Sequence, residues 1–221
     1  MHQLTPTPTS GRRDDAGFTL IELVVTVAIL GIVVTALAGV VLSYLRTTVD
    51  TNARLTESHD VQFAAAYWQR DVASIGVRST TYDPDETVHS YPLLSSVGLA
   101  PACSLPAGTP VATLAWTQYA VTDPDHPATV TVSYVADQAQ PPGGTWTLTR
   151  VRCTGAQVDN TVKVADNLTG LPTLACPGAG DCTGGGTSVP AVLTLTLTSS
   201  DPDGHDTAGY TATLTGERRQ S

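Results

Sequence analysis

The chain has 221 residues, of which 41% are hydrophobic, 14% charged and 5% aromatic, and its formal net charge is −9 at pH 7. A soluble domain usually has about a quarter charged residues, so we expect the apolar residues to be concentrated in one segment. The length leaves room for one ordinary domain beside that segment and argues against a multidomain enzyme. The acidic balance disfavours nucleic acid as a partner, because negative charges repel a phosphate backbone.

The N-terminal region contains a polar stretch followed by a long apolar one. Residues 1–17 are rich in proline, threonine and charge, which predicts a polar leader. Between 18 and 45, 21 of 28 residues are apolar and Glu22 is the only charged one. A helix of this length, at about 1.5 Å per residue, can cross a hydrocarbon layer of about 30 Å. We predict a single transmembrane helix over 18–45 with its N-terminus in the cytoplasm, because Arg12 and Arg13 precede it.

The helical pattern continues beyond the apolar segment and meets no breaker before Gly76. One apolar stripe at helical spacing is formed by Val61, Ala65, Trp68, Val72 and Ile75. The polar residues off this stripe are Gln62, Gln69, Arg70 and Asp71. We therefore predict one nearly continuous helix from Phe18 to about Ile75, in which 46–76 is the amphipathic continuation.

The remaining residues, 77–221, alternate between apolar and polar positions as β-strands do. Strands are predicted at 129–135, 145–153, 192–200 and 209–216, with turns at 123–126, 141–144 and 201–204 and a long irregular loop over 166–190. Threonines 194, 196 and 198 are expected to face solvent, and the leucines between them to meet the Trp68 stripe. The predicted fold class is α+β, with a long N-terminal helical spine packed on a C-terminal antiparallel β-sheet in an exported β-rich head domain.

Four cysteines, Cys103, Cys153, Cys176 and Cys182, follow the helix and would lie outside the membrane. An even number of cysteines in an exported domain predicts two disulfides. Three pairings are possible, and we favour Cys176 with Cys182 and Cys103 with Cys153. A zinc site and free buried thiols are the alternatives, although no C-x-x-C motif and no nearby histidine pair supports zinc.

The acidic loop DPDGHD places Asp201, Asp203 and Asp206 close together in the sequence. Carboxylates of this kind can bind calcium, but no bidentate glutamate follows at EF-hand spacing. A hairpin turn explains the same residues, so we predict no metal and no cofactor. The sequence also contains no G-x-S-x-G, P-loop or H-E-x-x-H motif, and we predict that the protein is not an enzyme.

The motif GFTLIEL at 17–23, followed by an apolar helix, resembles the processing site of type IV prepilins and pseudopilins. This resemblance implies a type IV pilin-like fold, cleavage between Gly17 and Phe18 by a prepilin peptidase, and N-methylation of Phe18. It also implies that Glu22 pairs with an N-terminal amine, its own or a neighbour's, during filament assembly. The alternatives are a plain signal anchor and a conventional signal peptide that ends at the A-x-A pattern at 36–38.

The segment YWQRDVASIG at 67–76 resembles the corresponding part of J-type minor pseudopilins and PilW-like minor pilins. Together the two resemblances imply a minor pilin or pseudopilin, a structural subunit of a type IV pilus or type II secretion filament. The implied partners are prepilin peptidase/methyltransferase, other pilin or pseudopilin subunits through helix packing, and the inner or cytoplasmic membrane before assembly into an extracellular or periplasmic filament. A filament-tip adhesin on the same scaffold is the alternative.

Overall fold

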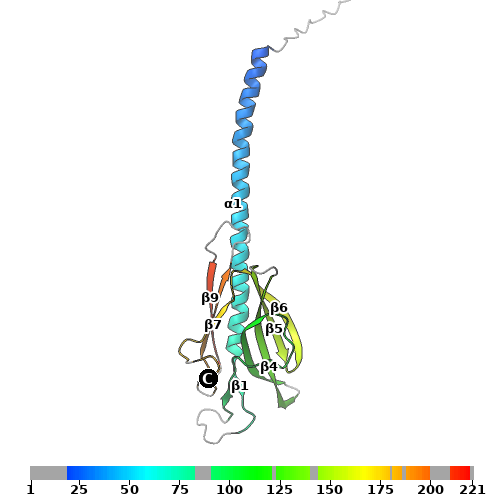
Figure 1. Ribbon diagram of the computed structural model, residues 1–221, viewed down its shortest axis with the longest axis vertical. Helices are drawn as coiled ribbons and strands as arrows, with labels where there is room; N and C mark the ends of the chain where they lie inside the picture. Colours follow the sequence, from blue (N-terminus) through cyan, green and yellow to red (C-terminus); the bar gives the residue numbers. More distant parts are fainter. Residues whose placement is uncertain are drawn as a thin grey trace, which may run out of the picture. The chain divides into compact units, whose positions relative to one another are not determined.

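The computed structural model describes residues 19–82, 91–120, 123–139, 144–179, 181–185, 188–199 and 210–219. The chain divides into two compact units, Met1–Val49 and Asp50–Ser221, called here the N-terminal and the C-terminal unit. The elements shown in Figure 1 are α1 (Leu20–Ser74), β1 (Val77–Arg78), β2 (Leu93–Leu94), β3 (Thr109–Ala120), β4 (Asp123–Gln138), β5 (Trp146–Thr154), β6 (Gln157–Leu168), β7 (Thr173–Ala175), β8 (Val192–Ser199) and β9 (Tyr210–Glu217).

Helix α1 is 55 residues long and confirms the single continuous helix predicted from the sequence. It begins after Thr19, whose hydroxyl accepts a hydrogen bond from the Glu22 N–H at 3.4 Å, as an N-cap residue does. Gly76 follows its end with a φ of 149°, a conformation that residues with a side chain rarely adopt. The Gly76 N–H donates to the Ala115 carbonyl at 3.1 Å, so the chain passes directly from the helix to the edge of β3.

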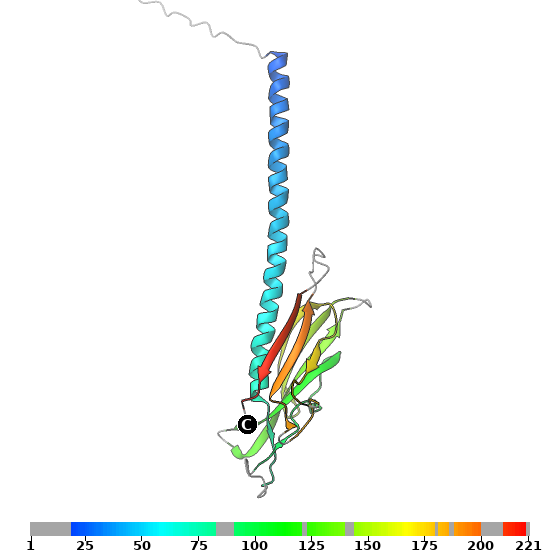
Figure 2. The same ribbon diagram turned by 90° about the vertical axis from the view of Figure 1, so that its left-hand side faces the viewer.

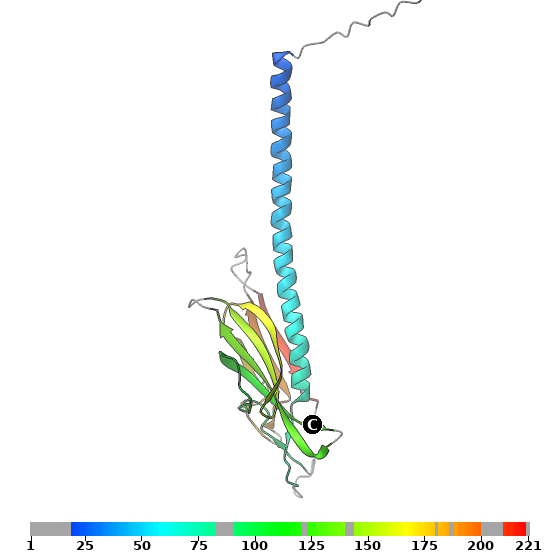
Figure 3. The same ribbon diagram turned by 90° about the vertical axis from the view of Figure 1, so that its right-hand side faces the viewer.

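The C-terminal unit contains one main sheet with strand order β3-β4-β5-β6-β8-β7, in which β9 pairs with β8. Each of these pairings is antiparallel. Figures 2 and 3 show the two sides of this sheet, with β8 and β9 in front in Figure 2 and the strands from β4 to β6 in front in Figure 3. The described part of the chain is thus an N-terminal apolar helix followed by an antiparallel β-sheet domain, which confirms the α+β class.

The strands predicted at 129–135, 145–153, 192–200 and 209–216 correspond to β4, β5, β8 and β9. The turn predicted at 123–126 is wrong, because β4 already begins at Asp123. The loop predicted over 166–190 is partly wrong, because it contains the end of β6 and all of β7. The polar residues at the start of β4, at the end of β6 and in β7 are held in strands by backbone hydrogen bonds. Backbone pairing does not depend on the type of side chain, so the side-chain pattern does not indicate it. Most of the turns predicted at 141–144 and 201–204 lies outside the described residues.

The main core of the C-terminal unit lies between α1 and the sheet. Trp68, Val72 and Ile75 are fully buried and belong to one apolar cluster with the leucines of β8. The Trp68 indole N–H donates to the Leu193 carbonyl at 3.4 Å, which ties the helix to a central strand. The predicted apolar stripe is therefore the face that meets the sheet. The three threonines of β8 are half-buried rather than fully exposed.

A smaller core covers the opposite side of β5, where Val151 and Cys153 pack with Cys103 and the partly buried Leu105. Nearby, the hydroxyls of Thr113 and Ser133 are buried and lie 3.1 Å apart in a hydrogen bond. Small polar residues of β3 and β4 on this side are thus interior residues with partners. Their alternation with apolar residues does not mark a solvent face here, because both side chains are buried.

Candidate functional site

The apolar part of α1, Leu20–Thr48, is long and apolar enough to cross a membrane. Its large apolar side chains from Leu20 to Leu45 are between 47% and 82% exposed, so none of the residues that the structure describes covers them. Exposing so much contiguous apolar surface to water is costly, and such surfaces belong in lipid or against another protein. This part of the helix is therefore suited to contacts with lipid or with another protein.

Most polar groups in the apolar part of α1 are satisfied within the helix. The Thr26 hydroxyl donates to the Glu22 carbonyl at 2.6 Å, and the Thr35 hydroxyl donates to the Gly31 carbonyl at 2.9 Å. The Glu22 carboxylate is different, because it makes no hydrogen bond or ion pair with any residue that the structure describes. A carboxylate in hydrocarbon costs about 2.5 to 3.5 kcal/mol at a helix centre and is normally paired. Between Leu20 and Leu45, Glu22 is the one charged side chain, and none of the described residues supplies its carboxylate with a partner.

The second part of α1 carries another carboxylate, Asp71, which is 1% exposed. Arg150 of β5 binds it with two hydrogen bonds, Nε to Oδ2 at 2.6 Å and Nη2 to Oδ1 at 2.8 Å. The Tyr134 hydroxyl of β4 donates to Oδ2 at 2.8 Å. Because all three side chains are buried, a helix and two strands are joined by one closed polar cluster.

Burial and charge in the Asp71 cluster shift the pKa values of its two partners. Burial, followed by the charge and hydrogen bond of Asp71, raises the pKa of Tyr134 far above its usual value. Burial lowers the pKa of Arg150, but the hydrogen bonds and charge of Asp71 outweigh this and leave the pKa raised. Both groups therefore keep their protons throughout the physiological range. The cluster is suited to holding α1 on the sheet and not to proton transfer.

The Asp71 cluster shows that a residue off the predicted apolar stripe can still be buried. Asp71 lies outside the apolar stripe, but Arg150 reaches it from the sheet. Arg150 occupies an inward position of β5, two residues after the buried Leu148. A charged residue at an inward position of an otherwise apolar strand was the signal that could have revealed the pair.

Both favoured disulfides are present in the structure. Cys103 is bonded to Cys153, with a sequence separation of 50 residues, and Cys176 is bonded to Cys182, with a separation of 6. The first bond holds the segment around Cys103 against β5, and the second closes a short surface loop. These bonds use all four cysteines, so neither free thiols nor a cysteine zinc site applies.

The processing residues Gly17 and Phe18 lie outside the described residues, as do Asp201, Asp203 and Asp206 of the candidate calcium loop. Among the residues that the structure does describe, no group of three or more histidine, cysteine, aspartate or glutamate side chains could hold a metal ion. The described candidates for function are therefore Glu22, which lacks a partner there, and the surfaces of the C-terminal unit.

An apolar helix with one unpaired carboxylate near its start, followed by an antiparallel sheet, defines a membrane-anchored protein whose arrangement is consistent with a type IV pilin-like fold. Residues 12–38 match the family described as the prokaryotic N-terminal methylation motif, which is the signature of type IV prepilins and pseudopilins. The match includes Gly17, Phe18 and Glu22. No curated protein and no solved structure matches the chain.

Proposed function

We propose that this chain is a minor pilin or pseudopilin, a structural subunit of a type IV pilus or type II secretion filament. The observation that carries the proposal is the unpaired Glu22 carboxylate within an uncovered apolar helix, inside a segment that matches the N-terminal methylation motif. In this role residues 1–17 are a leader that prepilin peptidase removes, and Phe18 becomes the methylated first residue. Residues 18–45 are the assembly helix, 46–76 its amphipathic continuation, and 77–221 the exported head.

In the proposed role, the apolar helix is covered first by the membrane and then by other subunits. The membrane holds it before assembly, with the N-terminus in the cytoplasm, and equivalent helices of other subunits cover it in the filament. A carboxylate and an ammonium buried together cost less than either buried alone. The Glu22 carboxylate therefore pairs with an N-terminal amine, and this pairing helps to set the depth at which a subunit enters the filament. The protein acts through assembly and catalyses no reaction.

The N-terminus of the protein from assembled filaments tests the processing step. We expect mass analysis to find N-methylated Phe18 as the first residue, and replacement of Gly17 by a bulky residue to leave the leader attached. A mature chain that begins at Gly39, after the A-x-A pattern, would contradict the proposal and indicate a conventional signal peptide.

A Glu22→Gln variant tests the assembly step, because it keeps the side-chain shape and removes the charge. We expect normal processing, normal membrane insertion and loss of incorporation into filaments. Thr26→Val is the matched control, since the Thr26 hydroxyl is satisfied within the helix.

Deletion of the gene distinguishes the assembly role from the adhesin alternative. Loss of filaments would support an assembly role, and normal filaments with lost adherence would favour a tip adhesin.

A further inference from the structure

Strand β9 forms an edge of the main sheet, and it lacks the features that usually keep an edge strand from pairing with other chains. It pairs with β8 over its whole length without a register shift, and no other described strand pairs with it. Its sequence, YTATLTGE, contains no lysine, no proline and no bulge, which are the devices that usually protect edge strands from other chains. An edge of this kind is a template for a further strand.

The hydrogen-bond pattern identifies which backbone groups of β9 face outward. The Arg218 N–H donates to the Ala191 carbonyl at 2.8 Å, so this opposed pair is a hydrogen-bonded one. Antiparallel pairs alternate between hydrogen-bonded and non-bonded, so the residues of β9 that bond to β8 are the even-numbered ones. The outward N–H and C=O groups belong to Thr211, Thr213, Thr215 and Glu217.

The row of outward groups ends at helix α1. The next outward N–H after Glu217 is that of Arg219, and it donates to the Ala73 carbonyl of α1 at 3.3 Å. The backbone groups of Thr211, Thr213 and Thr215 bond to no described residue on this side. Their repeat, two residues or about 7 Å, matches the repeat of another extended polypeptide. A strand added here would be stopped by the helix at the Arg219 end.

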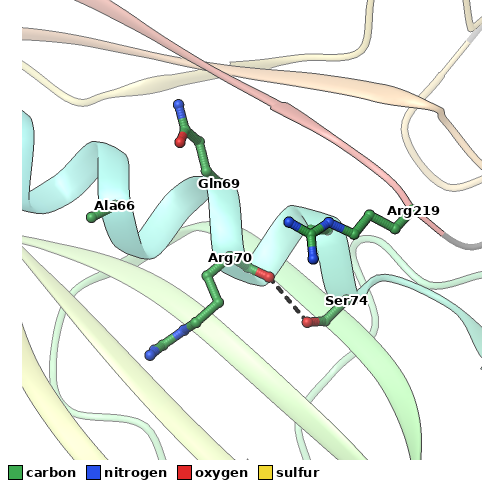
Figure 4. Close-up of a pocket in the computed structure, with 6 residues that line it drawn as sticks. Ala66, Gln69, Arg70, Ser74 and Arg219 are labelled. Atoms are coloured by element: carbon green, nitrogen blue, oxygen red, sulfur yellow. Dashed lines mark hydrogen bonds between the residues drawn. The ribbon is translucent and has the colours of Figure 1, made fainter.

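Space for an added strand lies beside the last turns of α1. Two adjoining hollows of about 420 Å³ each share Gln69, Ala73 and Arg219 as lining residues. Figure 4 shows one of them, with Gln69 and Arg70 pointing to opposite sides of the helix and the Arg219 side chain reaching back toward it. Figure 2 shows β9 running beside these turns of α1. The groove is therefore bounded by the helix and by the open edge of β9.

The groove is positively charged although the protein is acidic. Residues 79–216 carry 3 basic and 12 acidic residues, or −9, whereas the groove is lined by Arg70, Arg218 and Arg219 with Glu217 as the one acid among its described lining residues. Arg70 lies 3.8 Å from Asp71, which Arg150 already binds, and Arg218 donates to the Val189 carbonyl at 3.5 Å. The exposed Arg219 guanidinium makes no hydrogen bond or ion pair with a described residue. Such a site favours a carboxylate at the helix end of the added strand.

We propose that the β9 edge binds an extended segment of another polypeptide by strand addition, with a carboxylate of that segment beside Arg219. A second copy of β9 fits poorly. Antiparallel self-pairing over the whole strand would bring the partner's Glu217 near Thr211, far from Arg219, and parallel self-pairing would bring two Glu217 carboxylates together. The partner therefore differs from β9. This interaction goes beyond the filament role of α1 and does not depend on Glu22.

The test uses the full chain in detergent and a capped synthetic peptide of alternating threonine and valine with an aspartate at each end. Binding is measured by fluorescence anisotropy of the labelled peptide. We expect Thr213→Pro to weaken binding by about tenfold or more, because it removes one outward N–H and places a ring in the path of the added strand. Thr213→Val is the matched control, since it keeps the N–H, and Glu22→Gln is also expected to bind normally.

The role of the carboxylate is tested with a peptide that has asparagine at each end. It should bind several-fold more weakly to the wild type, and this difference should disappear in Arg219→Gln. Equal binding of the peptide to Thr213→Pro and Thr213→Val would overturn strand addition. Peptide binding that ignores the aspartates would overturn the proposed partner, and so would concentration-dependent self-association that Thr213→Pro abolishes.

Amide hydrogen exchange of the wild type tests strand addition without the Thr213→Pro variant, so this test does not depend on whether that variant folds. We expect peptide binding to slow exchange at Thr211, Thr213 and Thr215 while Ala212 and Leu214, which already bond to β8, stay unchanged. Absence of this alternation in the presence of saturating peptide would contradict the proposal.

Discussion

Each end of α1 carries a carboxylate, and the two carboxylates differ in burial and in their partners. Asp71 is buried in the C-terminal unit and receives three hydrogen bonds from Arg150 and Tyr134. Glu22 lies in the N-terminal unit among exposed apolar side chains, and no described residue binds its carboxylate. One end of the helix is covered by its own chain, whereas the apolar side chains at the other end are covered by no described residue. Substitutions in the two units should therefore affect different properties.

Loss of Arg150 should produce the largest change in the stability of the C-terminal unit. Arg150→Met leaves Asp71 buried without its charge partner, and breaking a buried pair in this way costs about 3 to 5 kcal/mol. Fluorescence-detected unfolding reports on this unit, because Trp68, Trp116 and Trp146 all belong to it. Adding Asp71→Leu to Arg150→Met should recover much of the loss. Glu22→Gln should leave the unfolding curve unchanged. A comparable loss of stability in Glu22→Gln would contradict the difference between the two units.

The two disulfides should differ in their contribution to stability. Loop-closure entropy predicts about 4 kcal/mol for Cys103–Cys153, whose separation is 50 residues, and about 2 kcal/mol for Cys176–Cys182, whose separation is 6. Replacing each pair by serine and comparing denaturant midpoints measures both values under the same conditions. Membrane insertion should not change in either variant. An equal loss for the two pairs would show that loop closure does not set their effect.

Close packing of β9 against α1 should make Gly216 intolerant of a side chain. A Cβ at Gly216 would lie 2.6 Å from the Cβ of Val72, so Gly216→Ala should cost about 1 to 3 kcal/mol through overpacking. Gly170→Ala is the matched control, because a Cβ there would meet nothing within 4 Å. Thermal unfolding of the two variants separates the effects, and equal melting temperatures would contradict this packing.

The exposed ion pair of Lys163 and Asp166 should have the smallest effect. Their Nζ and Oδ2 atoms are 2.6 Å apart, and the hydrogen bond lowers the pKa of Asp166 and raises the pKa of Lys163. Because solvent screens the pair, Asp166→Asn should cost less than about 1 kcal/mol. The carboxylate contribution is present above the unfolded pKa of about 3.9 and lost as pH falls through the lower folded value. The lysine contribution is lost as pH rises through its raised folded pKa.

Unfolding measured as a function of pH checks this last prediction, with the exposed Asp137→Asn as control. The difference between Asp166→Asn and the wild type should be constant near neutral pH and should vanish in strong acid. A difference that grows as pH falls would reverse the sign expected from the lowered pKa.

Local patterns predicted the elements that have a long apolar run or a clear period of apolar residues. The apolar run, the Trp68 stripe and the alternating strands each follow a periodicity that the backbone imposes. Strand β6 was missed because QVDNTVKVADNL is largely polar and exposed at its start, and its pairing with β5 is a backbone property. The start of β4 was missed for the same reason, since Asp and Pro residues are typical of turns.

By itself the sequence determined that an apolar helix carrying Glu22 precedes a strand-rich, disulfide-bonded unit, because run length, period and residue type are local properties. Only the tertiary structure decided that Asp71 is buried, since its partner Arg150 lies 79 residues away and no helical period indicates it. The open edge of β9 was likewise decided by tertiary structure, because an edge is defined by the absence of a neighbouring strand. Contacts between residues distant in the sequence depend on the order in which the strands pair, and the pattern of a single segment does not determine that order.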